Sequence, residues 1–168
     1  MKQFCLDTSA ISNPLQTLPE DVHPTLWKRV ATIIELGLIA VTTEIFEELQ
    51  GSISGMIGDC INSNRSSMVL EITASDWDDA SYVQHVQRMQ VEHRIYIAEY
   101  SDGNPVKTIC MNDVSNIALG KTLEVPVVSM ETSSTTSTKH KRIPDICTLE
   151  KVEHLDFNEL LRRAQIVI

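Results

Sequence analysis

The sequence predicts an α/β protein in which a central parallel sheet carries helices on both faces. Three observations lead to this prediction: short apolar runs recur along the chain, helical segments separate them, and turn-forming residues mark the joints. Strands that alternate with helices pair in parallel through crossover connections. Because the chain has 168 residues, no internal repeat and no linker-like stretch, we expect residues 1–168 to form a single domain.

The first part of the chain contains two apolar runs, and each is followed by helical sequence. Proline is tolerated in a first helical turn, so Pro24 marks a helix start, and Gly37 is a natural stop. Thr42 or Thr43 can cap the helix after the second run. The expected elements are a strand at 4–6, a helix from 24 to the stop at 37, a strand at 38–41, and helices at 44–51 and 53–62.

The remainder of the chain alternates in the same way. Aspartates in the first turns after Ser75 favour a helix start there, because the helix dipole stabilises negative charge at that end. The expected elements are an extended piece at 68–72, a helix from 75 towards 100 with a break, a turn at 101–105, a helix at 111–123, a strand at 126–129, a polar loop at 131–142 and a helix at 157–164.

Composition and charge exclude several classes of protein. No apolar run approaches the ~20 residues that span a bilayer, and the N-terminal residues lack a signal-peptide pattern, so we expect a cytoplasmic protein with no membrane contact. The four cysteines are scattered, which predicts reduced thiols rather than a zinc site. A net charge of −9 argues against a wholly polyanion-binding surface, but it permits a local basic patch or an acidic, metal-filled pocket.

Acidic residues follow the expected strands at the points where helices begin. Ligands of open parallel sheets bind beyond the carboxyl ends of the strands, so acids at these points are expected to converge. Carboxylates brought together in this way repel one another unless a cation is present, and Mg²⁺ or Mn²⁺ prefers such oxygen ligands. The chemistry that fits is metal-assisted phosphodiester hydrolysis. The acids are Asp7, Glu44, Glu48, Asp113 and Glu131.

Each acid also has an ordinary structural explanation. Asp7 and Asp113 are suited to helix N-capping, and Glu44 and Glu47 can be solvated acids of a first helical turn. Glu131 can be a loop carboxylate without a role. The functional hypothesis therefore rests on the joint pattern, in which acids recur at successive strand ends. The aromatic residues are interpreted mainly as core rather than as base-stacking surfaces; these are Trp27, Trp77, Tyr82 and Tyr96.

At these acids the chain resembles the PIN-domain ribonucleases, especially the VapC-type toxins of bacterial toxin–antitoxin pairs. Leu6–Ser9 (LDTS) is similar to the strand-ending signature of the family, and Thr42–Leu49 (TTEIFEEL) to its helix with a Glu-Leu pair. Asn112–Ala118 (NDVSNIA) and Val127–Glu131 (VVSME) resemble the two later motifs. The four motifs follow in the family's order along nearly the whole chain.

The resemblance implies a PIN-like α/β/α sandwich, a Mg²⁺- or Mn²⁺-dependent endoribonuclease, and a homodimer inhibited by a cognate antitoxin protein. It assigns the core metal-binding acids to Asp7, Glu48 and Asp113, with Glu131 as the fourth. Glu48 is preferred to Glu44 because it directly precedes Leu49, but Glu44 stays open. The hydroxyl that positions a water or substrate is matched by Thr8 or Ser9.

The chain departs from the family pattern in three places. It has extra helical sequence around 66–101, and Glu131 replaces the usual aspartate. The segment IPDIC resembles a PIN-like branch in which Asp145 is a further acid near the site, although Asp145 is equally suited to a first helical turn after Pro144. Cations before this segment can hold RNA phosphates or simply be solvated, and they are Lys139, Lys141 and Arg142.

Two other functions are compatible with the sequence. A catalytically weak PIN-like module that acts by binding a partner protein would retain the fold without cleavage. A phosphotransferase that uses Asp7 as a nucleophile is disfavoured, because such enzymes usually place a second aspartate two residues later, where this chain has Ser9.

Overall fold

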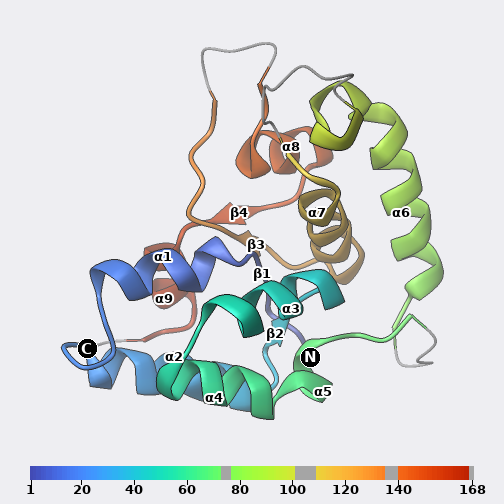
Figure 1. Ribbon diagram of the computed structural model, residues 1–168. Coiled ribbons are helices and arrows are strands. Elements are labelled where there is room, and N and C mark those ends of the chain that lie inside the picture. The colour runs from blue at the N-terminus through green and yellow to red at the C-terminus, as the bar shows by residue number, and fades with distance from the viewer. Residues whose placement is uncertain (73–76, 101–108, 135–139, 167–168) are drawn as a thin grey trace.

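Four short parallel strands form the central sheet in the computed structural model, which describes residues 1–72, 77–100, 109–134 and 140–166. They are β1 (Phe4–Leu6), β2 (Ile39–Ala40), β3 (Val127–Val128) and β4 (His154–Leu155). Their order is β2–β1–β3–β4, so β1 is paired on both sides (Figure 1). Helices cover both faces of this parallel sheet, which confirms the predicted α/β/α sandwich.

Strands β1, β2 and β3 are buried on both faces, and the register separates their side chains into two core clusters. Cys5 is paired with Ala40 on one side and with Val127 on the other, and these three residues belong to the same cluster. Leu6 and Val128 are paired one residue further on and belong to the other cluster, because successive strand residues face opposite ways. Such continuous burial explains why the strands read as short apolar runs.

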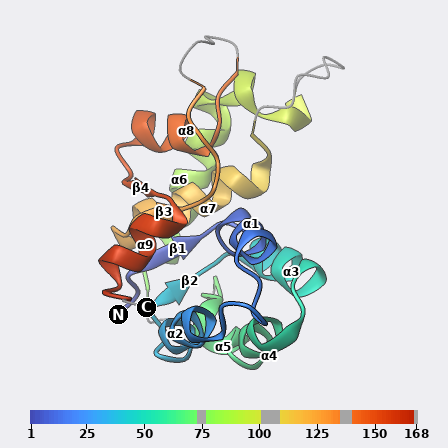
Figure 2. The ribbon, with the colours of Figure 1, turned by 90° about the vertical axis from the view of Figure 1, so that its left-hand side faces the viewer.

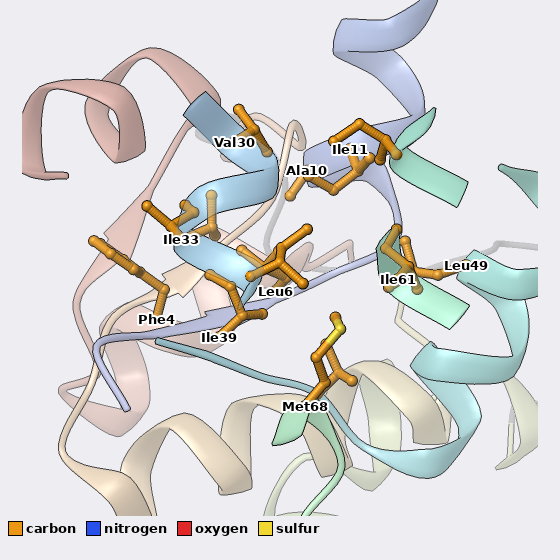
Figure 3. Packing of buried hydrophobic residues seen from close by; sticks show 14 of the residues in the cluster. Phe4, Leu6, Ala10, Ile11, Val30, Ile33, Ile39, Leu49, Ile61 and Met68 are labelled. Carbon is orange, nitrogen blue, oxygen red and sulfur yellow. The ribbon is translucent and has the colours of Figure 1, made fainter. Parts of the chain in front are cut away.

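One face of the sheet is covered by helices from both ends of the chain. Figure 3 shows Leu6 and Ile39 beside Ile33 on this face. Trp27 is fully buried there and stacks on Phe157 with ring centroids 5.6 Å apart, which confirms its interpretation as a core residue. The helices that contribute to this cluster are α1 (Ser9–Thr17), α2 (Pro24–Glu35), α3 (Thr43–Ser52), α4 (Gly55–Ser63), α5 (Arg65–Met68) and α9 (Phe157–Arg163).

The second face is covered by three helices, which lie on the opposite side of the strands from α2 and α4 (Figure 2). Trp77, Tyr82 and Tyr96 are partly buried against this cluster, in keeping with their interpretation as core. Cys5 and Cys147 are buried here, and all four cysteines are free, as predicted. The three helices are α6 (Asp79–Glu92), α7 (Met111–Leu123) and α8 (Ile143–Glu150).

Two predicted elements differ from the structure. The helix expected from 75 towards 100 is described from Asp79 and ends at Glu92, because His93 leaves the helix and its ring turns inward to Glu150; two 3-10 turns follow, η1 (Arg94–Tyr96) and η2 (Ala98–Tyr100). The extended piece expected at 68–72 is wrong for Met68, which is buried at the end of α5, and only Val69 forms an isolated bridge, to Val41.

Some expectations lie outside the described residues, and one concerns a membrane. The turn at 101–105, Ser75 and Lys139 all fall in the segments that are not described. Within residues 1–72, 77–100, 109–134 and 140–166, no helix has the length and apolar character needed to cross a bilayer.

Close packing of α7 on the sheet gives a first prediction. A Cβ atom on Gly120 would lie 2.7 Å from Val127 Cγ2 and 3.2 Å from the Val125 carbonyl oxygen. Gly120→Ala should therefore lower the free energy of unfolding by about 1–3 kcal/mol in urea denaturation, because α7 must move away from β3. Gly51→Ala in α3 is the matched control: its Cβ meets nothing within 4 Å, and it should stabilise the protein by up to about 1 kcal/mol. Equal effects of the two changes would contradict this account of the contact.

Candidate metal centre

Polar residues line the carboxyl edge of the sheet. They form a row across the strands that directly follows the last row of apolar residues. Counted along the paired register, two residues after Cys5, Ala40, Val127 and His154, this row contains Asp7, Thr42, Ser129 and Asp156. Thr42 and Asp156 cap the helices that follow, because their side chains accept hydrogen bonds from Ile45 N and Glu159 N. Asp7 and Ser129, on the two central strands, lie between these capped helix starts.

Asp7 is buried at the end of β1, with 7% of its surface exposed. Its Oδ2 accepts hydrogen bonds from the Ser9 amide, at 3.0 Å, and from the Ser9 hydroxyl. The strand alternation places its side chain on the same face as that of Cys5, which is the face covered by α7. Burial raises the pKa of Asp7, and the nearby Glu48 carboxylate raises it further. Asp7 thus accepts the first amide of α1, of which Thr8 is the N-cap residue, and it also faces other acids.

Asp113 lies opposite Asp7 in the first turn of α7. Its Oδ2 accepts a hydrogen bond of 2.7 Å from the amide of Cys110, which is the N-cap residue, so Asp113 is the acid of a capping box and not the N-cap that its sequence position suggested. Burial raises the pKa of Asp113 to about 6, and the charges of Asp7 and Glu131 add to this rise. A surface cap in water would not experience this repulsion, so the capping role and the acidic surroundings coexist at this residue.

Glu48 is held at this edge by residues adjacent to both aspartates. Its Oε2 accepts a hydrogen bond of 2.7 Å from the Thr8 hydroxyl, and its Oε1 accepts one of 2.9 Å from the Asn112 side-chain amide. Glu44, one turn earlier on α3, instead lines a separate small cavity of about 60 Å³ with Trp77 and Tyr82. The structure therefore places Glu48, and not Glu44, beside Asp7 and Asp113.

Glu131 approaches the same acids from the loop after β3. It is half-buried, it contributes to the raised pKa of Asp113, and its Oε2 accepts a hydrogen bond of 2.9 Å from Ile143 N at the start of α8. The preceding residue is tied to the centre as well, because the Met130 amide donates to the Ser9 hydroxyl oxygen at 2.9 Å. The four predicted acids are thus neighbours at one edge of the sheet.

Asp145 closes the polar loop instead of joining this group. Its carboxylate accepts hydrogen bonds from the Ser133 hydroxyl and from the amides of Ser134 and Arg142, the last at 2.8 Å. Burial acts to raise its pKa, but these hydrogen bonds outweigh burial and lower it. The alternative prediction, a first-turn acid after Pro144, describes this residue, since α8 has a proline in its first turn.

Asn116 is a structural residue of the site that the sequence interpretation missed. It is 1% exposed, its side-chain amide donates to the Leu6 carbonyl oxygen at 3.1 Å, and its Oδ1 accepts a hydrogen bond from the Cys5 thiol at 2.9 Å. These bonds fix α7 against the end of β1 and hold Asp113, one turn earlier, beside Asp7. An asparagine among apolar helical residues was the signal that could have revealed it.

The donor set suits a hard divalent cation. Asp7, Glu48, Asp113 and Glu131 offer carboxylate oxygens, and a cation would relieve the repulsion that raises the pKa of Asp7 and Asp113. The residues that could hold Mg²⁺ or Mn²⁺ are these four.

A tighter group of potential ligands occurs elsewhere. Among the described residues, Glu92, His93 and Glu150 have ligand atoms that all lie within 4.8 Å of one another. The charge of Glu150 is already neutralised. Both terminal guanidinium nitrogens of Arg88 donate to its carboxylate, and the Lys121 ammonium lies 3.2 Å from its Oε2. Burial acts to raise the pKa of Glu150, but hydrogen bonds from Arg88, His93 and Lys121 outweigh it and lower the pKa to about 2. Two adjacent cations make this group an ion-pair network rather than a metal site.

The chain belongs to the family described as Domain of unknown function (DUF4411), which it matches over residues 4–168. The match includes all four acids at the edge of the sheet. A comparison with curated proteins gives no match.

The raised pKa of Asp113 gives a second prediction. A proton on Asp113 stabilises the folded state below pH 4, and this contribution is lost as the pH rises through about 6. In EDTA, the unfolding free energy of the wild type should therefore fall by on the order of 1–3 kcal/mol more than that of Asp113→Asn between pH 4 and 7. Urea titrations across this range measure the difference. Asn keeps an acceptor for the Cys110 amide, and parallel pH profiles of the two proteins would contradict the assignment.

Proposed function

We propose that this protein is a Mg²⁺- or Mn²⁺-dependent endoribonuclease of the PIN type, which hydrolyses RNA phosphodiester bonds. The observation that carries the proposal is the meeting of Asp7, Glu48, Asp113 and Glu131 at the carboxyl edge of a parallel sheet, with the pKa of both aspartates raised. Acids spread over the surface for solubility would be separated and solvated. Here Asp7 is buried and Asp113 is half-buried beside other carboxylates, and a bound cation would offset their mutual repulsion.

The four acids divide the work of holding the metal. Asp7 and Asp113, on β1 and α7, are the best-fixed ligands, since each has one oxygen anchored by a backbone amide. Glu48 and Glu131 approach from α3 and from the loop after β3, so the metal would draw together groups from four segments. When bound, the metal activates a water for attack on the phosphate and stabilises charge on the leaving oxygen.

The two hydroxyls of the opening motif orient carboxylates. Ser9 donates to Asp7, and Thr8 donates to Glu48, so each hydroxyl selects one oxygen of its acid as a fixed hydrogen-bond acceptor. The role of Thr8 or Ser9 in contacting water or substrate remains part of this proposal, because both lie beside the ligands.

RNA would approach over the end of the polar loop. Arg142 is exposed and directly precedes Ile143, whose amide donates to Glu131, so the backbone of Arg142 lies next to the acidic edge. Lys141 is close enough to Asp145 to lower the pKa of that acid. Cations at this position would hold phosphates beside the metal and provide affinity that weakens with salt. Lys139 belongs to the same proposed surface by its place in the sequence.

The biological setting in the proposal rests on the sequence resemblance. It is a cytoplasmic toxin of a toxin–antitoxin module that acts as a homodimer and is inhibited by a cognate antitoxin protein.

The activity is tested with purified protein, Mn²⁺ or Mg²⁺, and a mixture of single-stranded and structured RNAs. Asp7→Asn should reduce the cleavage rate by at least about 100-fold, because it removes a charged ligand but leaves an acceptor for the Ser9 amide. Glu48→Gln should cause a loss of similar order. EDTA should abolish cleavage by the wild type.

Glu44→Gln is the matched control for Glu48→Gln, because both residues are exposed on α3 one turn apart. Its rate should stay within about 3-fold of the wild type, since Glu44 faces the separate cavity with Tyr82. Cleavage that survives both EDTA and Asp7→Asn would overturn the metal-nuclease proposal. Metal binding without cleavage of any RNA, together with tight binding of a partner protein, would instead favour a non-catalytic binding module.

A further inference from the structure

A buried serine and a histidine lie directly behind the fourth acid. Ser129, at the end of β3, is fully buried, and its Oγ is 2.8 Å from Nε2 of His154 on β4. The same Oγ accepts a hydrogen bond of 3.3 Å from the amide of Glu131. The serine hydroxyl therefore connects an imidazole on the edge strand to the backbone of a proposed metal ligand.

The orientation of the imidazole and its lack of charge suit this contact. His154 is paired with Val127, so its side chain lies on the same face of the sheet as those of Asp7 and Ser129. Burial lowers the pKa of His154 and outweighs the opposing charges of Glu159, Asp156 and Asp7, so the ring is neutral at neutral pH. A neutral ring with its proton on Nδ1 accepts the Ser129 hydroxyl hydrogen at Nε2 and leaves the serine oxygen to accept from Glu131.

Each of the three residues in this turn is held by a side chain. Ser129 is held by His154, the Met130 amide by Ser9, and the Glu131 amide by Ser129. Ser9 in turn donates to Asp7, so the hydrogen bonds run from β4 to the carboxylate at the end of β1. Glu131 has a long side chain with three rotatable bonds, and it can deliver its carboxylate to one place only if its backbone is fixed.

A packing role alone would not explain these two residues. Ser129 is fully buried and His154 is half-buried, and polar groups in such positions cost free energy unless they are hydrogen-bonded, a cost that apolar residues would not carry. Their mutual bond satisfies them, and its effect on other residues is to fix the Glu131 backbone.

We propose that His154 and Ser129 form a positioning pair that sets the Glu131 carboxylate, and through it the affinity of the acidic edge for a divalent cation. This inference rests on the proposed function. His154 touches neither the metal nor the substrate, and it acts through Ser129 and the Glu131 backbone. Outer partners of metal ligands typically change metal affinity by about 10- to 100-fold when they are removed.

The test is a calorimetric titration of the full chain with Mn²⁺ at pH 7.5. His154→Leu should weaken binding by about 10-fold, because leucine fills the space but cannot accept a hydrogen bond. His154→Gln should stay within about 3-fold of the wild type, since a glutamine side-chain oxygen can accept from Ser129 without titrating. Ser129→Ala should match His154→Leu, and the double variant should be no weaker than either single one, because both changes break the same connection.

Melting temperatures in EDTA separate this role from a general loss of stability. A purely structural histidine would lower the melting temperature of the metal-free protein while leaving Mn²⁺ affinity at 25 °C unchanged, and that result would overturn the inference. So would binding by His154→Gln as weak as that by His154→Leu. If His154→Leu does not fold, Ser129→Ala compared with the wild type decides the question.

The outcome for the positioning pair can be distinguished from the outcome for the metal centre. Asp113→Asn serves as the reference: it should abolish Mn²⁺ binding if the proposed centre is real. If Asp113→Asn abolishes Mn²⁺ binding while His154→Leu and Ser129→Ala bind Mn²⁺ as the wild type does, the metal centre is supported and the positioning pair is contradicted. Absence of Mn²⁺ binding by the wild type would contradict both the metal centre and the positioning pair.

Discussion

The position of β1 between two parallel partners is the constraint on which the candidate site depends. Strand β1 has three residues and no exposed face, and the chain leaves the sheet at Asp7. Because its two partners run parallel to it, their carboxyl ends lie at the same edge of the sheet. The hydrogen bonds of Asn116 tie α7 to the last two residues of that strand. The carboxyl ends of the strands meet α7 and α3 at this edge. Acids that are far apart in the sequence are therefore neighbours there.

The same carboxylates serve both the fold and the proposed chemistry. Asp7, Asp113 and Glu131 each accept a backbone amide at the start of a helix, and these bonds are available whether or not a cation is present. The amides hold the acids in place against their mutual repulsion. A ligand set that is anchored in this way loses little conformational freedom when it binds an ion, which favours affinity without new contacts.

The sequence indicated that the four acids lie near one another more clearly than it indicated the edges of the fold. Apolar runs revealed β1, β2 and β3. Asp7 and Glu131 were recognisable because they follow the first and the last of these runs, whereas Glu48 and Asp113 were recognisable by their place near the start of a helix. The strand β4 was missed, since two residues that begin with His154 carry no apolar signal, and that omission also hid the contact with Ser129. The choice between Glu44 and Glu48 depends on which side of α3 points towards Asp7, and the spacing of residues in the sequence does not supply this. The asparagine among apolar helical residues marks Asn116 as unusual, but the partners of its side chain depend on tertiary packing and have no local pattern.

The attachment of α6 combines apolar packing with charged contacts. Met89 is its buried residue, whereas Arg88 reaches across to Glu150 on α8, and His93 binds the same carboxylate just beyond the helix. Tyr82 and Val86 of α6 also pack against the second core cluster, so apolar burial holds this helix to the sheet as it holds the others. Salt screens exposed charge pairs far more than buried ones, and Glu150 is only 4% exposed. A rise in salt therefore weakens the exposed Arg88–Glu92 pair more than the contacts of Arg88 and His93 with Glu150, and α6 keeps its place beside α8.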